Sequence, residues 1–432
     1  MKTKSQLLPV FFKVLYGPAL CLFSMAYLPK FVMRLGQAND KSKMFRERFG
    51  CVENPFPGQP LICIHAVSVG EVLATKEFIR MFHISHPDHK IILTTTTPTG
   101  QSLAKKMESE FLRAAYFPMD FGSSVRHFLD AIKPRLIVIM ETEIWPNLIK
   151  EASQRRIPIG IMNGRISDRA IKRYLWVKEW FGELMNHLQF LSVRNEQDRD
   201  RFIEMGVNRD KVVVTGNMKF DIDADRNAVQ TSELRLNLGF QDKLVIVAGS
   251  THEGEEELIL RIFQQARTRH QNLKLVLAPR HIERAADVWR LVVAFPDLKV
   301  SLFSANHTSD CEVLILDTMG ELSKFYGVAD FVFIGGSLIP HGGQNPIEAA
   351  RERRAIIHGP YIHNFHDVYS QLDREKGAVL VHNESELQER INDLINNEQD
   401  RKALGLQAFE VVDRLRGASQ RNLQLLGPWL NN

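Results

Sequence analysis

Short apolar runs of strand length alternate with segments of helical pattern along the chain, and they do so in two series. The first series comprises residues 61–67, 91–97, 135–142, 157–163, 190–195 and 212–217. The second comprises residues 244–250, 273–279, 312–318, 331–337, 355–360 and 378–383, followed by a helical stretch expected over about 398–426. Runs of this length, rich in β-branched residues and separated by helices, are typical of parallel sheets covered on both faces. The pattern therefore predicts an α/β protein with two doubly wound domains that face a cleft.

The segment between the two series has a different character. Residues 220–232 are polar and acidic and show no apolar period, so we expect a linker there. The expected domains are then an N-terminal segment (1–30), a first Rossmann-like domain (31–219) and a second Rossmann-like domain (233–405). The C-terminal helical segment (406–432) is expected to pack back on the first domain.

The N-terminal segment carries a membrane signal. Residues 7–28 are apolar except for Lys13 and a few weakly polar positions, which is just long enough for a spanning helix of about 20 residues. Pro9 and Lys13 weaken that interpretation, and a helix lying in the membrane interface is the alternative. A buried helix of a soluble protein is the less favoured third possibility. The basic residues over 30–48 are expected to keep the body on the cytoplasmic side of the membrane.

Composition narrows the class of protein. The 432 residues are 44% hydrophobic and 25% charged, the ordinary balance of a large globular protein. A net charge of +4 is too small for a nucleic-acid-binding footprint. The four cysteines show no paired spacing, so we expect neither a zinc site nor a disulfide framework. These features favour an enzyme.

Several familiar motifs are missing. The chain has no phosphate-binding G-x-x-x-x-G-K-[ST] loop and no early G-x-G-x-x-G, which argues against a P-loop NTPase and a dinucleotide oxidoreductase. The segment 66–70 lacks the first glycine of a serine hydrolase nucleophile elbow. Two histidine groups, 83/86/89 and 358/363/366, have ligand-like spacing but no completing carboxylate or cysteine pattern. We expect the first group in a solvated surface loop rather than at a metal.

In the first domain, acidic and basic residues follow the strands. Glu71 falls in the first turn of a helix, where a carboxylate either complements the helix dipole or acts as a base toward an acceptor hydroxyl; local spacing does not decide between them. Glu141 and Glu143 leave the strand 135–142 and are expected on one face of it. Lys219 follows another strand end.

The second domain contains a candidate phosphate site. Arg280 ends a strand, where a guanidinium could clamp a phosphate. The segment 333–350 reads as strand, glycine-rich loop and helix, with Asn345 capping and Pro346 at the first helical position. Its glycines, Gly335, Gly336, Gly342 and Gly343, would let backbone N–H groups approach a phosphate. Ser250 and Glu253 have capping-box spacing, and capping is at least as plausible there as ligand contact.

Seven motifs, in this order and spacing, resemble the bacterial 3-deoxy-D-manno-octulosonic acid (Kdo) transferase family. They are HAVSVGE (65–71), METEIWPN (140–147), GNMKFD (216–221), STHEGEE (250–256), APRH (278–281), DTMGEL (317–322) and GGQNPIEAA (342–350). The resemblance covers nearly the whole chain. It implies the two-domain GT-B glycosyltransferase architecture, no metal, no cofactor, and transfer of Kdo from CMP-Kdo to a lipid A precursor at the inner membrane.

The resemblance also implies roles for individual residues. Glu71 corresponds to the proton acceptor, and Glu141 and Lys219 to transition-state stabilisers. The residues that match the family's CMP-binding positions lie in three segments: Pro279 and Arg280; Met319, Gly320 and Glu321; and Asn345, Pro346, Ile347 and Glu348. Ser250, Thr251, Gly336, Ser337 and Gln344 are further candidates. Gln344 departs from the family, which usually has His there, and Gln cannot become cationic.

With Glu71 as base, direct displacement predicts inversion at the anomeric carbon. Two alternatives remain at this stage: a GT-B enzyme that uses a UDP-sugar donor, and a membrane-tethered module that binds a nucleotide without turnover. The joint presence of Glu71, Glu141, Lys219 and Arg280 argues against the second.

Overall fold

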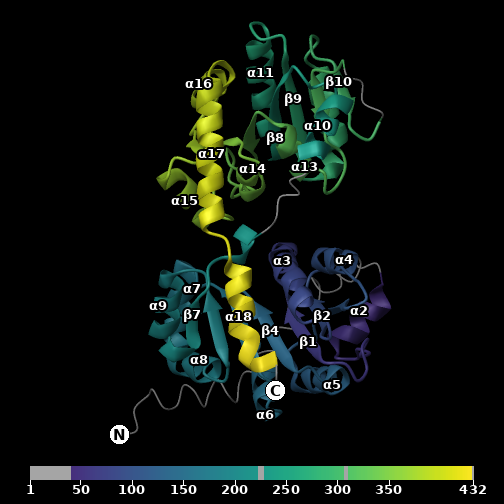
Figure 1. Cartoon of the computed structure of the whole chain (residues 1–432), viewed down its shortest axis with the longest axis vertical. Coiled ribbons are helices and arrows are strands. Elements are labelled where there is room, and N and C mark those ends of the chain that lie inside the picture. Colours follow the sequence, from purple (N-terminus) through teal and green to yellow (C-terminus); the bar gives the residue numbers. More distant parts are fainter. Residues whose placement is uncertain (1–39, 222–227, 306–309, 431–432) are drawn as a thin grey trace. The chain divides into compact units, whose positions relative to one another are not determined.

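The computed structural model describes residues 40–221, 228–305 and 310–430, and these form two compact units (Figure 1). Unit 1 comprises the chain up to residue 222 together with residues 416–432, and unit 2 comprises residues 223–415. The predicted membrane segment, residues 1–30, lies outside the described residues. Within the described ranges, no helix combines the length and the apolar character that a membrane crossing requires.

Unit 1 is built on a seven-stranded parallel sheet with strand order β3-β2-β1-β4-β5-β6-β7. The strands are β1 (Leu61–His65), β2 (Lys90–Thr95), β3 (Leu112–Tyr116), β4 (Leu136–Met140), β5 (Ile159–Gly164), β6 (Phe190–Val193) and β7 (Val212–Val214). The helices are α2 (Lys41–Arg48), α3 (Val69–Ser85), α4 (Pro98–Lys106), α5 (Gly122–Ile132), α6 (Pro146–Gln154), α7 (Asp168–Tyr174), α8 (Lys178–Met185), α9 (Glu196–Glu204) and α18 (Ala418–Leu430). A 3₁₀ turn, η4 (Met218–Asp221), follows β7.

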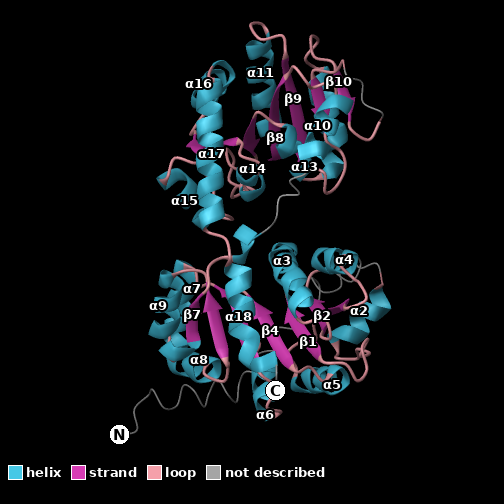
Figure 2. Cartoon of the chain, in the orientation of Figure 1, coloured by secondary structure: helices cyan, strands magenta, loops and turns pink. Residues whose placement is uncertain are grey.

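The central strands of unit 1 are buried on both faces, which is why they are apolar throughout rather than alternating. Every residue of β1 and β4 is buried, and helices cover both sides of the sheet (Figure 2). All six strands predicted for this half are present. The sequence pattern missed β3, an edge strand of composition LRAAY that has no β-branched residue.

The C-terminal helix α18 belongs to unit 1. The Asp221 carboxylate accepts the backbone N–H groups of Gly417 (2.7 Å) and Ser419 (2.5 Å), and Asn422 bonds Ser192 and Thr215 of the sheet. The chain returns to unit 1 at residue 416, whereas we expected the returning segment to begin at 406, which lies inside α17 (Glu398–Arg414). The single helical stretch predicted over 398–426 is two helices, separated at Gly417 with φ +90°.

Unit 2 has a second seven-stranded parallel sheet, with strand order β10-β11-β9-β8-β12-β13-β14. The strands are β8 (Leu244–Thr251), β9 (Leu273–Pro279), β10 (Val300–Leu302), β11 (Val313–Ile315), β12 (Phe331–Ile334), β13 (Ala355–His358) and β14 (Val379–Leu380). The helices are α10 (Ala228–Asn237), α11 (Glu255–Arg267), α12 (Ala285–Val293), α13 (Leu322–Val328), α14 (Ile347–Arg351), α15 (His366–Arg374), α16 (Glu384–Asn396) and α17, and η5 (Ile282–Arg284) is a 3₁₀ turn.

Two details of unit 2 differ from the sequence prediction. The edge strand β10 was missed because it is half-exposed and has a serine between its two apolar residues, so it contains no apolar run. Helix α10 begins at Ala228, inside the range 220–232 expected to be a linker, and the chain after it is anchored by the buried side chains of Leu238 and Phe240.

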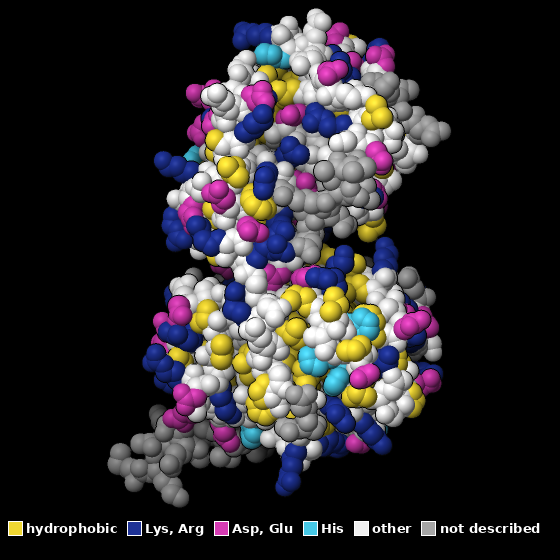
Figure 3. Space-filling view, viewed as in Figure 1, with side chains coloured by type: hydrophobic (Ala, Val, Ile, Leu, Met, Phe, Trp, Pro, Cys, Tyr) yellow, Lys and Arg dark blue, Asp and Glu magenta, His cyan; other side chains and the backbone are white. Residues whose placement is uncertain are grey.

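Each sheet contains a point where the strand order reverses. In unit 1 this point lies between β1 and β4, and in unit 2 it lies between β8 and β12. In open parallel sheets, ligands bind beyond the carboxyl ends of the strands at such a point. On the face drawn in Figure 3, basic and acidic side chains are interspersed, so the charge on that face does not point to a different ligand site.

Candidate functional site

Glu71 lies at the reversal point of unit 1, in the first turn of α3 as predicted. Its Oε2 accepts the backbone N–H of Val67 (2.7 Å), and its Oε1 accepts the Ser68 hydroxyl (3.1 Å). The side chain is only 7% exposed. Burial, followed by the negative charge of Glu141, raises the pKa of Glu71 to about 7. Glu71 therefore caps its helix locally and also has the proton affinity of a base that works near neutral pH.

Glu141 follows β4, the strand next to β1. The strand ends at Met140 and Glu141 adopts φ +54°, so the predicted placement of Glu141 and Glu143 on one face of a continuing strand is wrong. The backbone turns instead. The Glu141 carboxylate pairs with Lys219 Nζ (3.1 Å) and with Arg165 Nε (3.1 Å). Burial alone would raise the pKa of Glu141, but these two cations outweigh it and the pKa is lowered.

Glu143 lies in the same acidic group. Burial raises its pKa to about 7, and the charge of Glu141 contributes to that shift. The charges of both Glu141 and Glu143 raise the pKa of Glu71, so the protonation of these carboxyl groups is coupled. Glu141 is the one kept ionised, because it alone is paired with two cations.

Lys219 follows β7, the strand at the edge of the sheet, and its side chain contacts Glu141. It belongs to η4, which follows β7, and η4 is fixed by two amide side chains. Asn163 Oδ1 accepts the Met218 N–H (3.0 Å), and Asn217 Oδ1 accepts the Lys219 N–H (3.1 Å). The structure thus brings Glu71, Glu141 and Lys219 together. Sequence reasoning missed Asn163, the last residue of the predicted strand 157–163, and Arg165, which follows β5 directly.

In unit 2, all candidate positions lie at or after the carboxyl ends of strands. Ser250 and Thr251 are the last two residues of β8, Pro279 ends β9 and Arg280 follows it, residues 319–321 follow β11, and residues 336–337 and 344–348 follow β12. The Arg280 side chain is exposed, and within the part of the chain that the structure describes its guanidinium has no ion-pair partner. Met319 is 77% exposed, and Glu321 pairs with Lys324 (2.8 Å).

The glycine-rich loop after β12 is built differently from our expectation. The buried carboxylate of Glu255 accepts four backbone N–H groups, those of Gly336 (2.7 Å), Ser337 (3.1 Å), Leu338 (3.1 Å) and His252 (3.0 Å). The Gly336 N–H is therefore occupied, and the N–H groups of Gly335 and Gly343 donate to the carbonyls of Gly249 (2.8 Å) and Gly336 (2.7 Å). For these three of the four predicted glycines, the N–H group is used inside the protein rather than left for a phosphate. Sequence reasoning missed Glu255 because it is the first of three consecutive glutamates in a helix start.

Two predicted helix caps in unit 2 are also corrected. Helix α11 begins at Glu255 after Gly254, so Ser250 and Glu253 do not form a capping box. Helix α14 begins at Ile347 rather than Pro346 and is five residues long, which leaves little dipole at its N-terminus. Asn345 nevertheless accepts the Ile347 N–H (3.1 Å), and its amide donates to Glu348 Oε1 (3.4 Å).

The histidine groups do not form a metal site. Over residues 40–221, 228–305 and 310–430, no cluster of three or more His, Cys, Asp or Glu side chains could hold a metal ion. His83 lies in α3 and stacks on Phe111 (ring centroids 3.6 Å apart), so the predicted solvated loop is wrong for it. His358 is buried and bonds Asp373 (2.8 Å).

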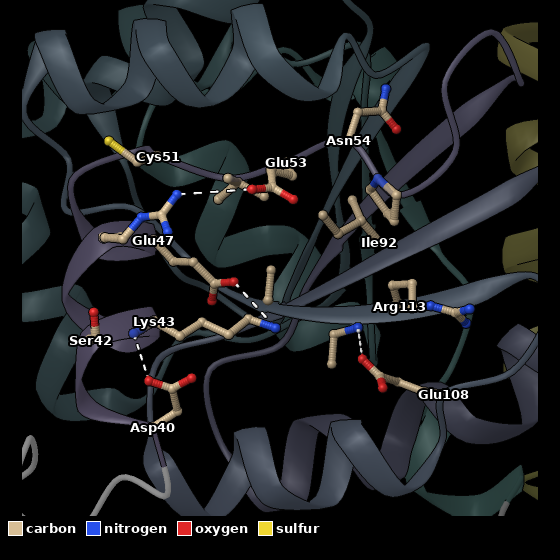
Figure 4. Close-up of a pocket in the computed structure, with 15 residues that line it drawn as sticks. Asp40, Ser42, Lys43, Glu47, Cys51, Glu53, Asn54, Ile92, Glu108 and Arg113 are labelled. Carbon is tan, nitrogen blue, oxygen red and sulfur yellow. Dashed lines mark hydrogen bonds and ion pairs between the residues drawn. The ribbon is translucent and has the colours of Figure 1, made fainter.

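A cavity of about 470 Å³ lies beside α2 in unit 1 (Figure 4). Two ion pairs join charged side chains that line it, Lys43 with Glu47 (3.7 Å) and Arg46 with Glu53 (3.9 Å), and Glu108 accepts the Ala114 N–H (3.0 Å). None of the predicted site residues lines this cavity. It is therefore separate from the acidic group around Glu71.

Comparison with known proteins agrees with this arrangement. The sequence model of the family described as 3-Deoxy-D-manno-octulosonic-acid transferase (kdotransferase) matches residues 43–222. The chain is 33% identical over 413 residues to the 3-deoxy-D-manno-octulosonic acid transferase of Haemophilus influenzae, covering 93% of this chain and 96% of that protein. It is 28% identical over 391 residues to the enzyme of the same name from Bordetella pertussis, covering 87% of this chain and 89% of that one.

Solved structures show the same fold at low identity. The UDP-GlcNAc 2-epimerase of Neisseria meningitidis matches with a TM-score of 0.58 at 15% identity, covering 85% of this chain and 99% of that one. A glycosyltransferase from Rickettsia africae also matches with a TM-score of 0.58, at 12% identity, covering 87% of this chain and 100% of that one. The fold, two parallel-sheet domains, is similar to that of GT-B glycosyltransferases.

Proposed function

The chain belongs to the 3-deoxy-D-manno-octulosonic acid (Kdo) transferase family and is a glycosyltransferase, and from this premise we propose that it transfers Kdo from CMP-Kdo to a lipid A precursor of the lipid IVA type. The observation that carries the proposal is the buried carboxyl group of Glu71, which has a pKa of about 7. It is influenced by Glu141, a carboxylate that Lys219 and Arg165 keep ionised. Such a group is suited to removing a proton from a sugar hydroxyl at neutral pH.

In the proposed step, the Glu71 carboxylate takes the proton of the acceptor hydroxyl. The hydroxyl oxygen forms a bond to the anomeric carbon of Kdo while the bond from that carbon to the phosphate oxygen breaks, and the electron pair leaves with CMP. Direct displacement inverts the configuration at that carbon. Glu141, held ionised by Lys219 and Arg165, strengthens the base because its charge raises the pKa of Glu71.

The donor is assigned to unit 2. The Arg280 guanidinium is available to stabilise the phosphate of the departing CMP, which in other glycosyltransferases is often the task of a metal ion. The carboxyl group of Glu348, fixed by Asn345, is suited to accept from the ribose hydroxyls. Burial raises the pKa of Glu348 and the Asn345 amide opposes that shift, so a hydrogen-bonding ligand that replaces lost water would favour the ionised form.

We expect purified protein to convert CMP-Kdo and a lipid A precursor into a Kdo-containing lipid and CMP, detected by mass spectrometry. UDP-sugars serve as the control donors, because a transferase of another GT-B class would use them instead. Product formed from a UDP-sugar and not from CMP-Kdo would contradict the proposal, and nucleotide binding without any product would indicate a module without turnover.

We also propose that residues 1–30 attach the protein to the cytoplasmic face of the inner membrane, because they contain an apolar run flanked by basic residues. The adjoining helix α2 supports this proposal: it exposes Phe45 and Phe49 beside Lys41 and Arg46, a combination suited to an anionic lipid surface.

Deletion of residues 1–29 should move the protein from the membrane fraction to the soluble fraction at high salt, because the remaining basic contacts are screened. The body should keep its far-UV circular dichroism and its melting temperature. Retention of the truncated protein on membranes in high salt would show that the attachment lies elsewhere.

A further inference from the structure

Three histidine rings from three different loops meet at the reversal point of the unit 2 sheet. His252 follows β8, His281 follows β9, and His341 lies in the glycine-rich loop after β12. The rings of His252 and His341 are stacked, with centroids 4.3 Å apart and planes 7° apart. The ring of His281 meets that of His252 edge-on, with centroids 5.8 Å apart. Within the residues that the structure describes, these rings belong to no cluster of three or more side chains that could hold a metal ion.

His252 is the central ring of this histidine cluster. Its Nε2 atom is buried and has no hydrogen-bond partner among the residues that the structure describes. The ring lies directly over Gly336, where an added Cβ would come within 3.2 Å of it and within 3.4 Å of the Gln344 amide nitrogen. A side chain at position 336 would therefore crowd the His252 ring, and the Nε2 atom of His252 is enclosed without a hydrogen bond.

Two arginines, Arg280 and Arg284, act on His252, as do the rings of His281 and His341. Burial lowers the pKa of His252 to about 4, and these four neighbours add to that shift. The nearby carboxylates are already used: Glu255 accepts four backbone N–H groups, and Glu256 pairs with Arg284 (2.7 Å). The next acidic residue on the loop, Glu253, is exposed and acts on Arg284. Arg280, which has no ion-pair partner among the residues that the structure describes, thus supplies the positive potential of the cluster, and the neutral His252 ring offers an N–H donor. This environment favours an anion.

We propose that His252, His281 and His341, together with Arg280, bind the carboxylate of the donor sugar and so select a 2-ulosonic acid donor over an aldose donor. This inference rests on the proposed function. In the CMP derivative of such an acid, the anomeric carbon carries both the phosphate ester and the carboxylate, so two anions lie on one carbon. If Arg280 binds the phosphate, the carboxylate on the same carbon lies close to His281, the next residue in the chain. It then also lies close to His252, whose ring the His281 ring meets edge-on. A UDP-aldose has a hydrogen atom in place of this carboxylate and gains nothing from the cluster.

The test compares three probes by calorimetry on the full-length protein: CMP, a non-hydrolysable CMP-Kdo analogue, and the same analogue with its carboxylate reduced to a hydroxymethyl group. His252→Phe keeps a stacking ring and removes both nitrogens, and His281→Ala removes the edge-on ring. We expect each substitution to weaken the carboxylate analogue about tenfold to a hundredfold, the usual loss of a charge-assisted hydrogen bond. Affinity for CMP and for the reduced analogue should change less than about twofold, as expected for groups that touch only the carboxylate.

Retained CMP affinity in each variant also shows that unit 2 is folded. Arg280→Ala is the contrasting variant and should weaken all three probes, because it acts on the phosphate that they share. Unchanged affinity for the carboxylate analogue in both histidine variants would overturn the inference, and so would an equal loss for CMP, which would assign the cluster to the phosphate. A wild-type protein that binds neither CMP nor the analogue would instead overturn the proposed function itself.

Discussion

Glu71→Gln should lower kcat about 10²–10⁴-fold while leaving CMP affinity unchanged, because the substitution removes the proton acceptor and keeps the shape of the side chain. The amide can still accept one of the two local hydrogen bonds, from the Val67 N–H or the Ser68 hydroxyl, so α3 should remain formed. CMP affinity is the internal control, because the candidate CMP-binding residues all lie in unit 2. Single-turnover measurement of Kdo transfer separates the chemical step from product release.

The matched control is Glu196→Gln, which changes a first-turn glutamate of α9 that is exposed and pairs only locally, with Arg199. If Glu71 served only the helix dipole, both substitutions would cost about 0.3–1 kcal/mol of stability and leave turnover intact. Near-normal turnover of Glu71→Gln with a lowered melting temperature would therefore return Glu71 to a capping role, and Glu141 would be the next residue to test.

The pH profile gives an independent check on the same residue. A base must be deprotonated to act, so kcat/KM should rise with pH through about 7, the pKa of Glu71, and level off above it. Glu143 also titrates near 7, so the observed midpoint belongs to the coupled pair. Glu143→Gln should keep the rise but move it to lower pH, because the negative charge that raises the pKa of Glu71 is gone. A profile without this limb in wild-type protein would contradict the assignment.

The features that the sequence predicted well are those set by local pattern. Strands buried on both faces are apolar at every position, as β1 and β4 are, and their lengths and spacing predict the parallel sheets. The first-turn position of Glu71 follows from the end of a strand and the start of a helical period. The two edge strands differ from this pattern: β3 is largely buried but has no β-branched residue, and β10 is half-exposed.

The features that it could not predict depend on contacts between distant segments. Lys219 and Glu141 are 78 positions apart and follow strands that are not neighbours in the sheet, yet their side chains pair. Glu255 occupies backbone N–H groups 81–83 positions away, so residues 336–338 of the glycine-rich loop are held by internal hydrogen bonds. No periodicity encodes such pairs. They become visible only when the order of the strands is known.

The Lys219–Glu141 pair is expected to give the second large effect. Lys219→Met should lower kcat about 10²–10³-fold, the usual loss when one preorganised charged group is removed from a site. It should also cost about 1–3 kcal/mol of stability, because the half-buried carboxylate of Glu141 loses one of its two cations. Arg165→Met is the matched control: it removes the other cation, whose side chain is 47% exposed, so solvent can compensate and both losses should be smaller.

The double variant Lys219→Met/Glu141→Gln separates catalysis from support. It removes both charges, so no uncompensated carboxylate is left behind and much of the stability lost in Lys219→Met should return. Turnover should not return, because the charge that raises the pKa of Glu71 has also been removed and the base is weaker. The acidic limb of the kcat/KM profile should accordingly shift below 7 in the double variant. Recovery of both stability and turnover would mean that the pair only holds η4 in place, and that Glu71 acts without help from either residue.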